Sequence, residues 1–133
     1  MLSVKKTVLS FLFGVFISFA YGQARLGYSE REIRNESTRR IFETGYTEEN
    51  IKFIFTTYSY GSVAYYFTSE GLCQMCVVRP NNQGSLNYLI EEYNKLYVII
   101  SDTKWKMYNN TGVMLIELIY DKNGTCHFEF NLR

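Results

Sequence analysis

Three cysteines carry the most reactive side chains of this sequence, and two of them lie in the motif Cys73-Gln74-Met75-Cys76. At the start of a helix this spacing is typical of a redox pair, but here it falls in a run with the pattern of a β-strand. Residues three apart on a regular strand point to opposite faces and lie roughly 10 Å apart, whereas a disulfide tolerates roughly 7 Å. We therefore expect no bond within the motif, and Cys126 is the candidate disulfide partner for Cys73 or Cys76.

Zinc bound by the three cysteines and His127 is the alternative. A structural zinc ion needs four thiolate or imidazole ligands that converge on one point. Cys126 and His127 are neighbours on a predicted strand, where adjacent side chains point to opposite faces. We therefore expect no metal site and no cofactor, and we expect the thiols to be buried or joined in a single disulfide.

The last two predicted strands form a hairpin whose register follows from its hydrophobic pattern. Cys126, Phe128 and Phe130 alternate with polar residues and should face the core. A three-residue loop, Lys122-Asn123-Gly124, gives this arrangement if Gly124 adopts a left-handed conformation. The predicted cross-strand pairs are Tyr120 with Cys126 and Leu118 with Phe128.

This register sets Glu117 directly opposite Glu129 on the outer face, with His127 next to them. Two carboxylates at about 5 Å repel each other unless a cation, a proton or a ligand lies between them. A histidine beside an acid pair could act as a general acid or base. The competing interpretation is a solvated polar face, because the sequence places no nucleophile or oxyanion donor beside these residues.

Tyrosines gather in a second predicted hairpin, around residues 58–66. Tyr58, Tyr60, Tyr65 and Tyr66 lie there, and alternation forces some of them away from the core. Tyr58, Tyr60 and Tyr66 are therefore the candidate binding residues, because exposed aromatic rings offer a large contact area at little entropic cost. The alternative is that they are buried under the first helix or the N-terminal segment.

The first 22 residues have the features of an export signal. Lys5 and Lys6 precede an apolar run over residues 8–20, which ends in Ala20-Tyr21-Gly22. The run of about 13 residues is shorter than the roughly 20 needed to span a bilayer as a helix. We expect cleavage before Gln23, a single domain over residues 23–133 without a membrane anchor, and a periplasmic or extracellular location.

Composition excludes several classes of partner. The chain has 133 residues, a formal net charge of +1, 47% hydrophobic residues and 17% aromatic residues. A hydrophobic core is feasible, and the balanced charge gives no electrostatic reason to bind nucleic acid or an anionic membrane. Phosphate-binding glycine loops, the Gly-x-Ser-x-Gly elbow and His-Glu-x-x-His are absent from the sequence.

The remaining patterns predict strands and two helices. Ser29 and Glu32 form a capping box ahead of a short helix at about 30–36. Apolar residues recur at helical spacing over 86–97 and predict a long amphipathic helix at about 85–97. Strand patterns cover 39–45, 51–58, 63–68, 72–79, 104–108, 113–120 and 125–131, and residues 98–100 are expected to form a buried connection.

The predicted fold class is therefore α+β. A single antiparallel sheet with meander connections carries the long amphipathic helix on one face and the short helix at its N-terminal end. We expect the long helix to cover the concave side of the sheet and the opposite side to stay free. Two similar units, each a helix followed by strands, are visible without a repeat at the level of residues.

The C-terminal half contains the predicted helix, then Lys104-Trp105-Lys106-Met107-Tyr108, then two strands with alternating aromatic residues. Over residues 85–132 this arrangement resembles small exported bacterial proteins of unknown function. The helix and meander are also similar to outer-membrane assembly lipoproteins and β-lactamase-inhibitor-like domains. The resemblance implies a role in protein binding.

Three functional hypotheses follow. The first is an exported, non-catalytic domain that binds a protein or a glycan through a tyrosine-rich sheet face. The second is a small hydrolase or metal-dependent enzyme that uses Glu117, Glu129 and His127. The third is a structural envelope protein without a small-molecule site.

Overall fold

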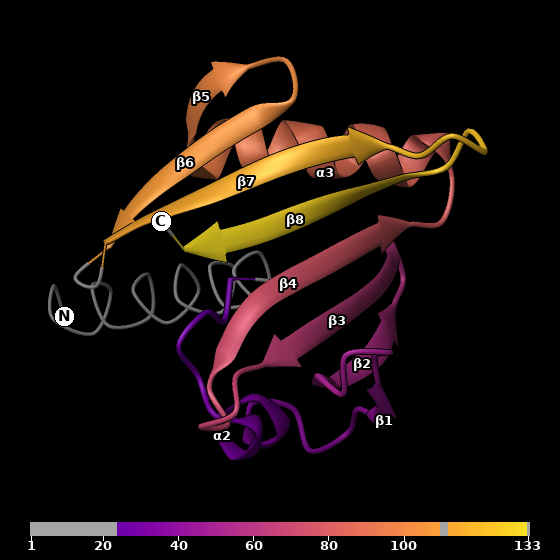
Figure 1. Cartoon of the computed structure of the whole chain (residues 1–133). Coiled ribbons are helices and arrows are strands. Elements are labelled where there is room, and N and C mark those ends of the chain that lie inside the picture. The colour runs from indigo at the N-terminus through magenta and orange to yellow at the C-terminus, as the bar shows by residue number, and fades with distance from the viewer. Residues whose placement is uncertain (1–23, 110–111, 133) are drawn as a thin grey trace, which may run out of the picture.

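The computed structural model describes residues 24–109 and 112–132, and about half of these are in strands. All eight strands belong to one antiparallel sheet, and two short helices make up a further 19% of the residues (Figure 1). The predicted signal peptide, residues 1–22, lies outside the described residues. In the described part of the chain, no helix is both long and apolar enough to cross a membrane.

The sheet consists of two meanders joined in the middle. The strand order is β1-β2-β3-β4-β8-β7-β6-β5, so β4 and β8 pair at the centre while β1 and β5 form the two edges. The elements, in chain order, are α2 (Glu30–Asn35), β1 (Glu43–Tyr46), β2 (Lys52–Tyr58), β3 (Gly61–Phe67), β4 (Cys73–Pro80), α3 (Gln83–Leu96), β5 (Val98–Ser101), β6 (Lys104–Asn109), β7 (Gly112–Tyr120) and β8 (Cys126–Leu132).

Helix α3 carries the chain from the middle of the sheet to its far edge, behind β6, β7 and β8 in Figure 1. Its 14 residues span about 21 Å at 1.5 Å per residue. In Figure 1 its axis runs nearly along β7, so the helix returns the chain to the end of the sheet at which β5 begins.

The core lies between the helices and one face of the sheet, which we call the inner face. One row of direct cross-strand partners runs through six strands, and each of its members is at most 1% exposed: Ile54, Tyr65, Cys76, Phe130, Ile116 and Trp105. Ile33 of α2 and Leu86, Leu89 and Tyr93 of α3 belong to the same buried cluster. Both helices therefore contribute to one continuous core.

The predicted α+β class with a long amphipathic helix is wrong. The molecule is mostly one eight-stranded antiparallel sheet, and in the described residues no long amphipathic helix is present. Helical spacing in the sequence continues to Tyr97, but Tyr97 already has extended backbone angles (φ −122°, ψ 164°) and α3 ends at Leu96. The chain enters β5 at once, because pairing with β6 satisfies backbone groups that a longer helix would carry away from the sheet.

The predicted buried connection at 98–100 is also wrong. These residues belong to β5, and Val98, Ile99 and Ile100 are 49–56% exposed. In the sequence, an apolar run predicts a buried segment. In the structure, β5 is an edge strand that pairs only with β6 and lies beyond the part of the sheet that α3 covers. Its position in the sheet, rather than its composition, leaves these side chains in solvent.

Two local predictions are confirmed. Ser29 and Glu32 form the capping box of α2. In the last hairpin, Tyr120 pairs with Cys126 and Leu118 with Phe128, and Gly124 has a φ of 86°. The three-residue loop thus sets the predicted register.

Candidate functional site

The face of the sheet opposite the helices, which we call the outer face, is the candidate site. Two rows of direct cross-strand partners cross it from β1 to β5. The first row is Gly45, Phe53, Tyr66, Met75, Asn131, Leu115, Lys106 and Val98, and the second is Glu43, Phe55, Ala64, Val77, Glu129, Glu117, Lys104 and Ser101. Apart from Glu43, both rows are apolar on β1–β4 and mainly polar or charged on β8–β6.

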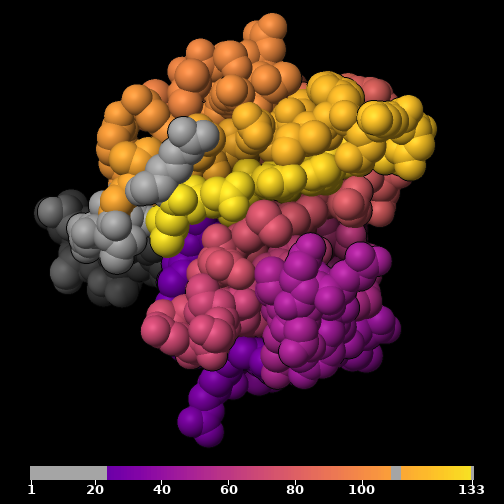
Figure 2. All heavy atoms as spheres, in the orientation of Figure 1, coloured from indigo at the N-terminus to yellow at the C-terminus, as the bar shows by residue number. Residues whose placement is uncertain are grey.

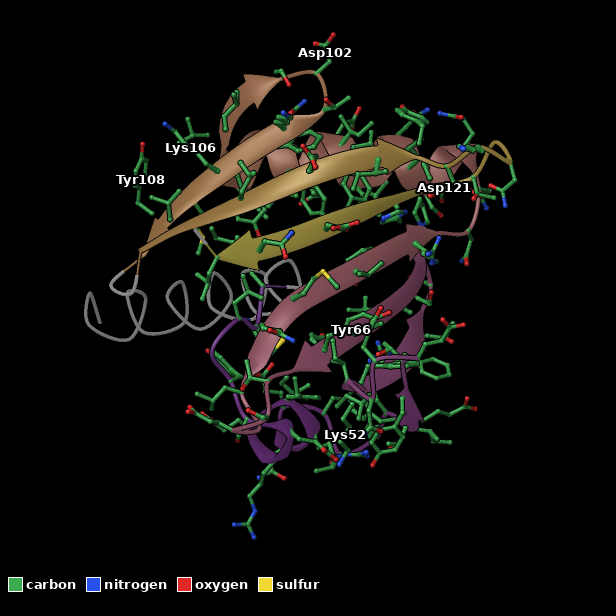
Figure 3. The ribbon with its side chains drawn as sticks, in the orientation of Figure 1. Lys52, Tyr66, Asp102, Lys106, Tyr108 and Asp121 are labelled. Atoms are coloured by element: carbon green, nitrogen blue, oxygen red, sulfur yellow. The ribbon has the colours of Figure 1, made fainter. Side chains whose placement is uncertain are left out.

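The N-terminal strands carry an aromatic patch, defined here as Phe53, Phe55 and Tyr66. Phe53 has its ring centroid 6.0 Å from that of Phe55 and 5.1 Å from that of Tyr66. A Cβ atom on Gly45 would overlap the Phe53 ring, so this glycine allows the ring to lie directly on β1. The three rings are half-buried, and Tyr66 is seen on the front of β3 in Figure 3.

The three candidate tyrosines do not form one surface. Tyr66 lies on the outer face, whereas Tyr58 shares the inner side of β2 with Ile54 and Thr56. Tyr60 is buried and stacks on Tyr58 with ring centroids 5.3 Å apart. The predicted tyrosine surface is thus divided between the two faces of the sheet.

The Tyr58 ring is also covered by a cation. The Arg40 guanidinium lies 3.6 Å from the Tyr58 ring centroid and donates a hydrogen bond of 2.8 Å to the carbonyl of Thr57. Beyond Phe55, β2 has no partner in β1, so Arg40 occupies a free edge carbonyl there. Tyr58 therefore belongs to a packed corner of the molecule.

Sequence reasoning missed Phe53 and Phe55. The signal was present, because residues 51–58 are apolar at both odd and even positions. In an antiparallel sheet such a strand must place aromatic rings on the solvent-facing side as well as in the core. Ile54 pairs with Tyr65 in the core, and only this pairing shows that the odd-numbered residues of β2 face outward.

The C-terminal strands carry a charged network around His127. Its Nε2 lies 2.8 Å from Glu129 Oε2, and its Nδ1 lies 3.3 Å from Asp121 Oδ2. The side chain of His127 is only 11% exposed. Arg79 on β4 approaches Asp121 with its Nη1 at 3.5 Å, so the network ties β4 to the β7–β8 hairpin. Asp121 is labelled near the end of β7 in Figure 3.

Glu117 and Glu129 are direct cross-strand partners, as predicted. Each carboxylate has its own partner. Lys104 Nζ lies 3.4 Å from Glu117 Oε1, and His127 Nε2 lies 2.8 Å from Glu129 Oε2. The expected repulsion is thereby relieved without an added ion. The structure brings Glu117, Glu129 and His127 together on one face.

The network is better suited to holding strands together than to acid–base catalysis. Both nitrogens of His127 face carboxylate oxygens, so neither points towards a space that a substrate could occupy. Partial desolvation raises the pKa of Asp121, but hydrogen bonds from Thr125 and His127 and the charges of His127 and Arg79 lower it more. The pKa of Asp121 therefore lies below its usual value, and this carboxylate stays ionised.

Three hollows of the surface have walls that do not include Glu117, His127 or Glu129. A hollow of about 690 Å³ lies between residues 37–43 and β2, and one of about 630 Å³ lies beside Lys52 and Phe67. A smaller one, of about 340 Å³, has Arg79 and Cys126 in its wall.

The predicted geometry of the cysteine motif is wrong. The Sγ atoms of Cys73 and Cys76 lie 3.8 Å apart, and both side chains are buried. Tyr66 pairs with Met75 but Phe67 pairs with Cys73, so Gln74 is an extra residue in β4. A β-bulge of this kind resets the alternation of side chains, which places both cysteines on the inner face.

Cys126 is remote from the pair. Cys76 pairs with Phe130, and Cys126 lies four residues further along β8, roughly 13 Å away. This exceeds the roughly 7 Å that a disulfide tolerates. Within the described residues, no group of three or more His, Cys, Asp and Glu side chains is placed to hold a metal ion.

The fold and site define a class of architecture: an antiparallel sheet protein whose outer face is aromatic on one half and charged on the other. Figure 2 shows this face, with the N-terminal strands in indigo to pink next to the C-terminal strands in orange and yellow. No family model matches the chain, and no curated protein or solved structure matches it either.

Proposed function

We propose that the chain is an exported, non-catalytic binding domain that contacts a protein partner through the aromatic patch. The observation that carries the proposal is the cluster of Phe53, Phe55 and Tyr66 on a sheet face that neither α2 nor α3, the helices of the described residues, covers. Large rings held on a rigid strand surface are typical anchors of protein interfaces, since little side-chain entropy is lost on binding.

The surroundings of the patch favour a protein over a glycan. Ala64, Met75 and Val77 extend the apolar area next to the rings, and charged side chains of both signs follow on β8, β7 and β6. An apolar centre with a polar rim is the usual anatomy of a protein interface. A sugar ring would also need polar groups that converge beside the aromatic rings, and Phe53 and Phe55 supply none.

Two further considerations support this function. The export signal predicted at residues 1–22 would place the domain outside the cytoplasm, where adhesive or inhibitory domains meet their partners. In the acid–base cluster that the sequence predicts, both imidazole nitrogens of His127 face carboxylate oxygens. This arrangement favours binding over the hydrolytic alternative.

The proposal is tested by capture followed by measurement with a purified partner. The tagged chain is used to capture proteins from its native envelope or culture fluid, and each captured protein is purified. Its affinity is then compared between the wild type and the double variant Phe55→Ser/Tyr66→Ser. We expect the double variant to bind at least about tenfold more weakly, which is about 1.4 kcal/mol.

Tyr120→Ser serves as the matched control, because Tyr120 is 63% exposed but lies at the end of β7, outside the patch. Its affinity for the partner should equal that of the wild type. Equal binding by the double variant would refute the role of the patch. Patch-dependent retention of a polysaccharide, with no protein partner, would replace the protein by a glycan.

A further inference from the structure

The two cysteines of the motif in β4 form a buried pair that the proposed binding function does not use. Cys73 is 2% exposed and Cys76 is fully buried, and their Sγ atoms are 3.8 Å apart. A disulfide needs about 2.05 Å between the sulfurs, so each sulfur has to move by less than about 1 Å. Small rotations about the Cα–Cβ bonds cover this distance.

The bulge at Gln74 is what makes the pair. On a regular strand the two side chains would lie on opposite faces, but the extra residue brings both to the inner face. The Cys73 thiol donates to the carbonyl of Met75 at 3.6 Å, within the same bulge. The bulge therefore already brings the two sulfurs to within 3.8 Å of each other on one face of the sheet in the folded chain.

The pair also lies where the N-terminal segment docks on the sheet. The N–H of Gly27 donates to the Cys73 carbonyl, and the N–H of Cys73 donates to the Tyr28 carbonyl, both at 2.7 Å. Ala24 and Leu26 pack against the buried cluster that contains both cysteines. Residues 24–28 are therefore held on the backbone of Cys73 at the edge of the bulge, and the shape of the bulge determines how this segment is held.

We propose that Cys73 and Cys76 form an intramolecular disulfide by exchange with an organic disulfide, such as a disulfide-bonded oxidoreductase or oxidised glutathione. One cysteine, as its thiolate, attacks a sulfur of the oxidant and releases a thiolate, which gives a mixed disulfide. The second cysteine, as its thiolate, then attacks the first and forms the S–S bond. Two electrons pass to the oxidant, which leaves as two thiols, and both cysteines lose their protons.

The bond would fix the bulge and thereby strengthen the docking of residues 24–28. Burial raises the pKa of the Cys76 thiol well above its ordinary value, so its thiolate is scarce in the folded state. Exchange should therefore proceed during folding or while residues 24–28 are detached. Cys126 stays free, because it lies roughly 13 Å from Cys76 along the sheet.

The test uses the full chain in a buffer of oxidised and reduced glutathione, approached from two starting states. One sample starts folded and reduced, and the other is refolded from urea in the same buffer. Both are quenched with acid and alkylated, and the adducts are located by peptide mass spectrometry. We expect one alkylated cysteine, Cys126. The peptide that contains Cys73 and Cys76 should carry no alkyl group and should be lighter by two hydrogen atoms than the same peptide with two free thiols.

Cys126→Ser is the matched control, since it removes the third thiol and leaves the pair intact. It should give the same disulfide with no free thiol. Trypsin should also cut after Arg25 several-fold more slowly in the oxidised chain than in the reduced chain. The rate of cleavage is proportional to the fraction of molecules in which residues 24–28 are detached from the sheet, and the disulfide should lower that fraction. A disulfide that includes Cys126, or three free thiols from both starting states, would overturn the proposal.

Discussion

The two halves of the molecule have the same order of elements but different helices and different outer faces. Residues 30–80 form α2 and β1–β4, and residues 83–132 form α3 and β5–β8, with mirrored strand order. Helix α2 has six residues and buries Ile33, whereas α3 has 14 residues and buries Leu86, Leu89 and Tyr93. One topology therefore accommodates very different helical contributions to the core.

The outer faces differ in the same way. The N-terminal half presents the aromatic patch, and the C-terminal half presents paired charges around His127 and Glu117. Ion pairs at a surface contribute little stability, whereas half-buried rings on a sheet face have apolar area still available for contact. The C-terminal half therefore buries more of its helix in the core, and the N-terminal half has the outer face that is better suited to binding.

The largest expected difference between the halves concerns their helices. Tyr93 of α3 makes edge-on contacts with Trp105, Phe128 and Phe130, with ring centroids 4.9–5.8 Å apart. We expect Tyr93→Ala to lower the free energy of unfolding by about 3–5 kcal/mol, and Ile33→Ala by about 2 kcal/mol because the short α2 can settle into the space. Urea denaturation followed by tryptophan fluorescence measures both. Equal losses would contradict the distinction between the two cores.

A smaller difference is expected at two glycines with positive φ. A Cβ on Gly61 (φ +153°) would overlap the carbonyl oxygen of Arg79, whereas a Cβ on Gly124 (φ +86°) would meet nothing within 4 Å. Gly61→Ala should therefore cost about 2–3 kcal/mol, through both strain and overlap. Gly124→Ala should cost about 1 kcal/mol through strain alone. Thermal or urea unfolding of the two variants checks this order.

The smallest effects concern one carboxylate in each half. Hydrogen bonding by Lys52 lowers the pKa of Glu30, although burial opposes it, and Arg34 lowers it further. The pKa of Asp121 is also lowered. Because both folded pKa values lie below the unfolded ones, these groups stabilise the fold above pH 4.5 and pH 3.8, their ordinary values.

This contribution is lost as the pH falls through the folded pKa values. Glu30→Gln should lower stability near neutral pH by less than about 1 kcal/mol, since the pair is partly exposed, and should flatten the decline of stability in acid. Asp121→Asn should flatten it at lower pH than Glu30→Gln does. Urea midpoints between about pH 6 and pH 3 test this. An unchanged acid slope in both variants would show that neither carboxylate is anchored as the structure indicates.

Much of the local structure could be predicted from the sequence. The capping box of Ser29 and Glu32 and the register of Glu117 opposite Glu129 follow from short-range rules on caps, turns and alternation. The fold class could not be predicted, because the exposed β5 and the end of α3 depend on where each strand lies in the sheet. Composition shows that a segment is apolar, but position decides whether it is buried.

The candidate site was only partly predictable for a related reason. Tyr66 was identified, but its neighbours Phe53 and Phe55 were not, because a strand with apolar residues at both odd and even positions does not reveal which of the two sets faces outward. The cysteine pair was missed because a single extra residue, Gln74, reverses the alternation on which the prediction relied. Such bulges arise from pairing with a neighbouring strand, and the strand itself does not encode them.

By itself, the sequence determined the strand-forming segments other than β5, the hairpin turns and the charges that pair across the last hairpin. These depend on residues close together along the chain, where backbone preferences and alternation act directly. Only the tertiary structure decided the strand order, the exposure of β5, the gathering of three aromatic rings on one face and the approach of Cys73 to Cys76. Those features depend on contacts between distant segments, because hydrogen-bond pairing across the sheet fixes which side chains meet.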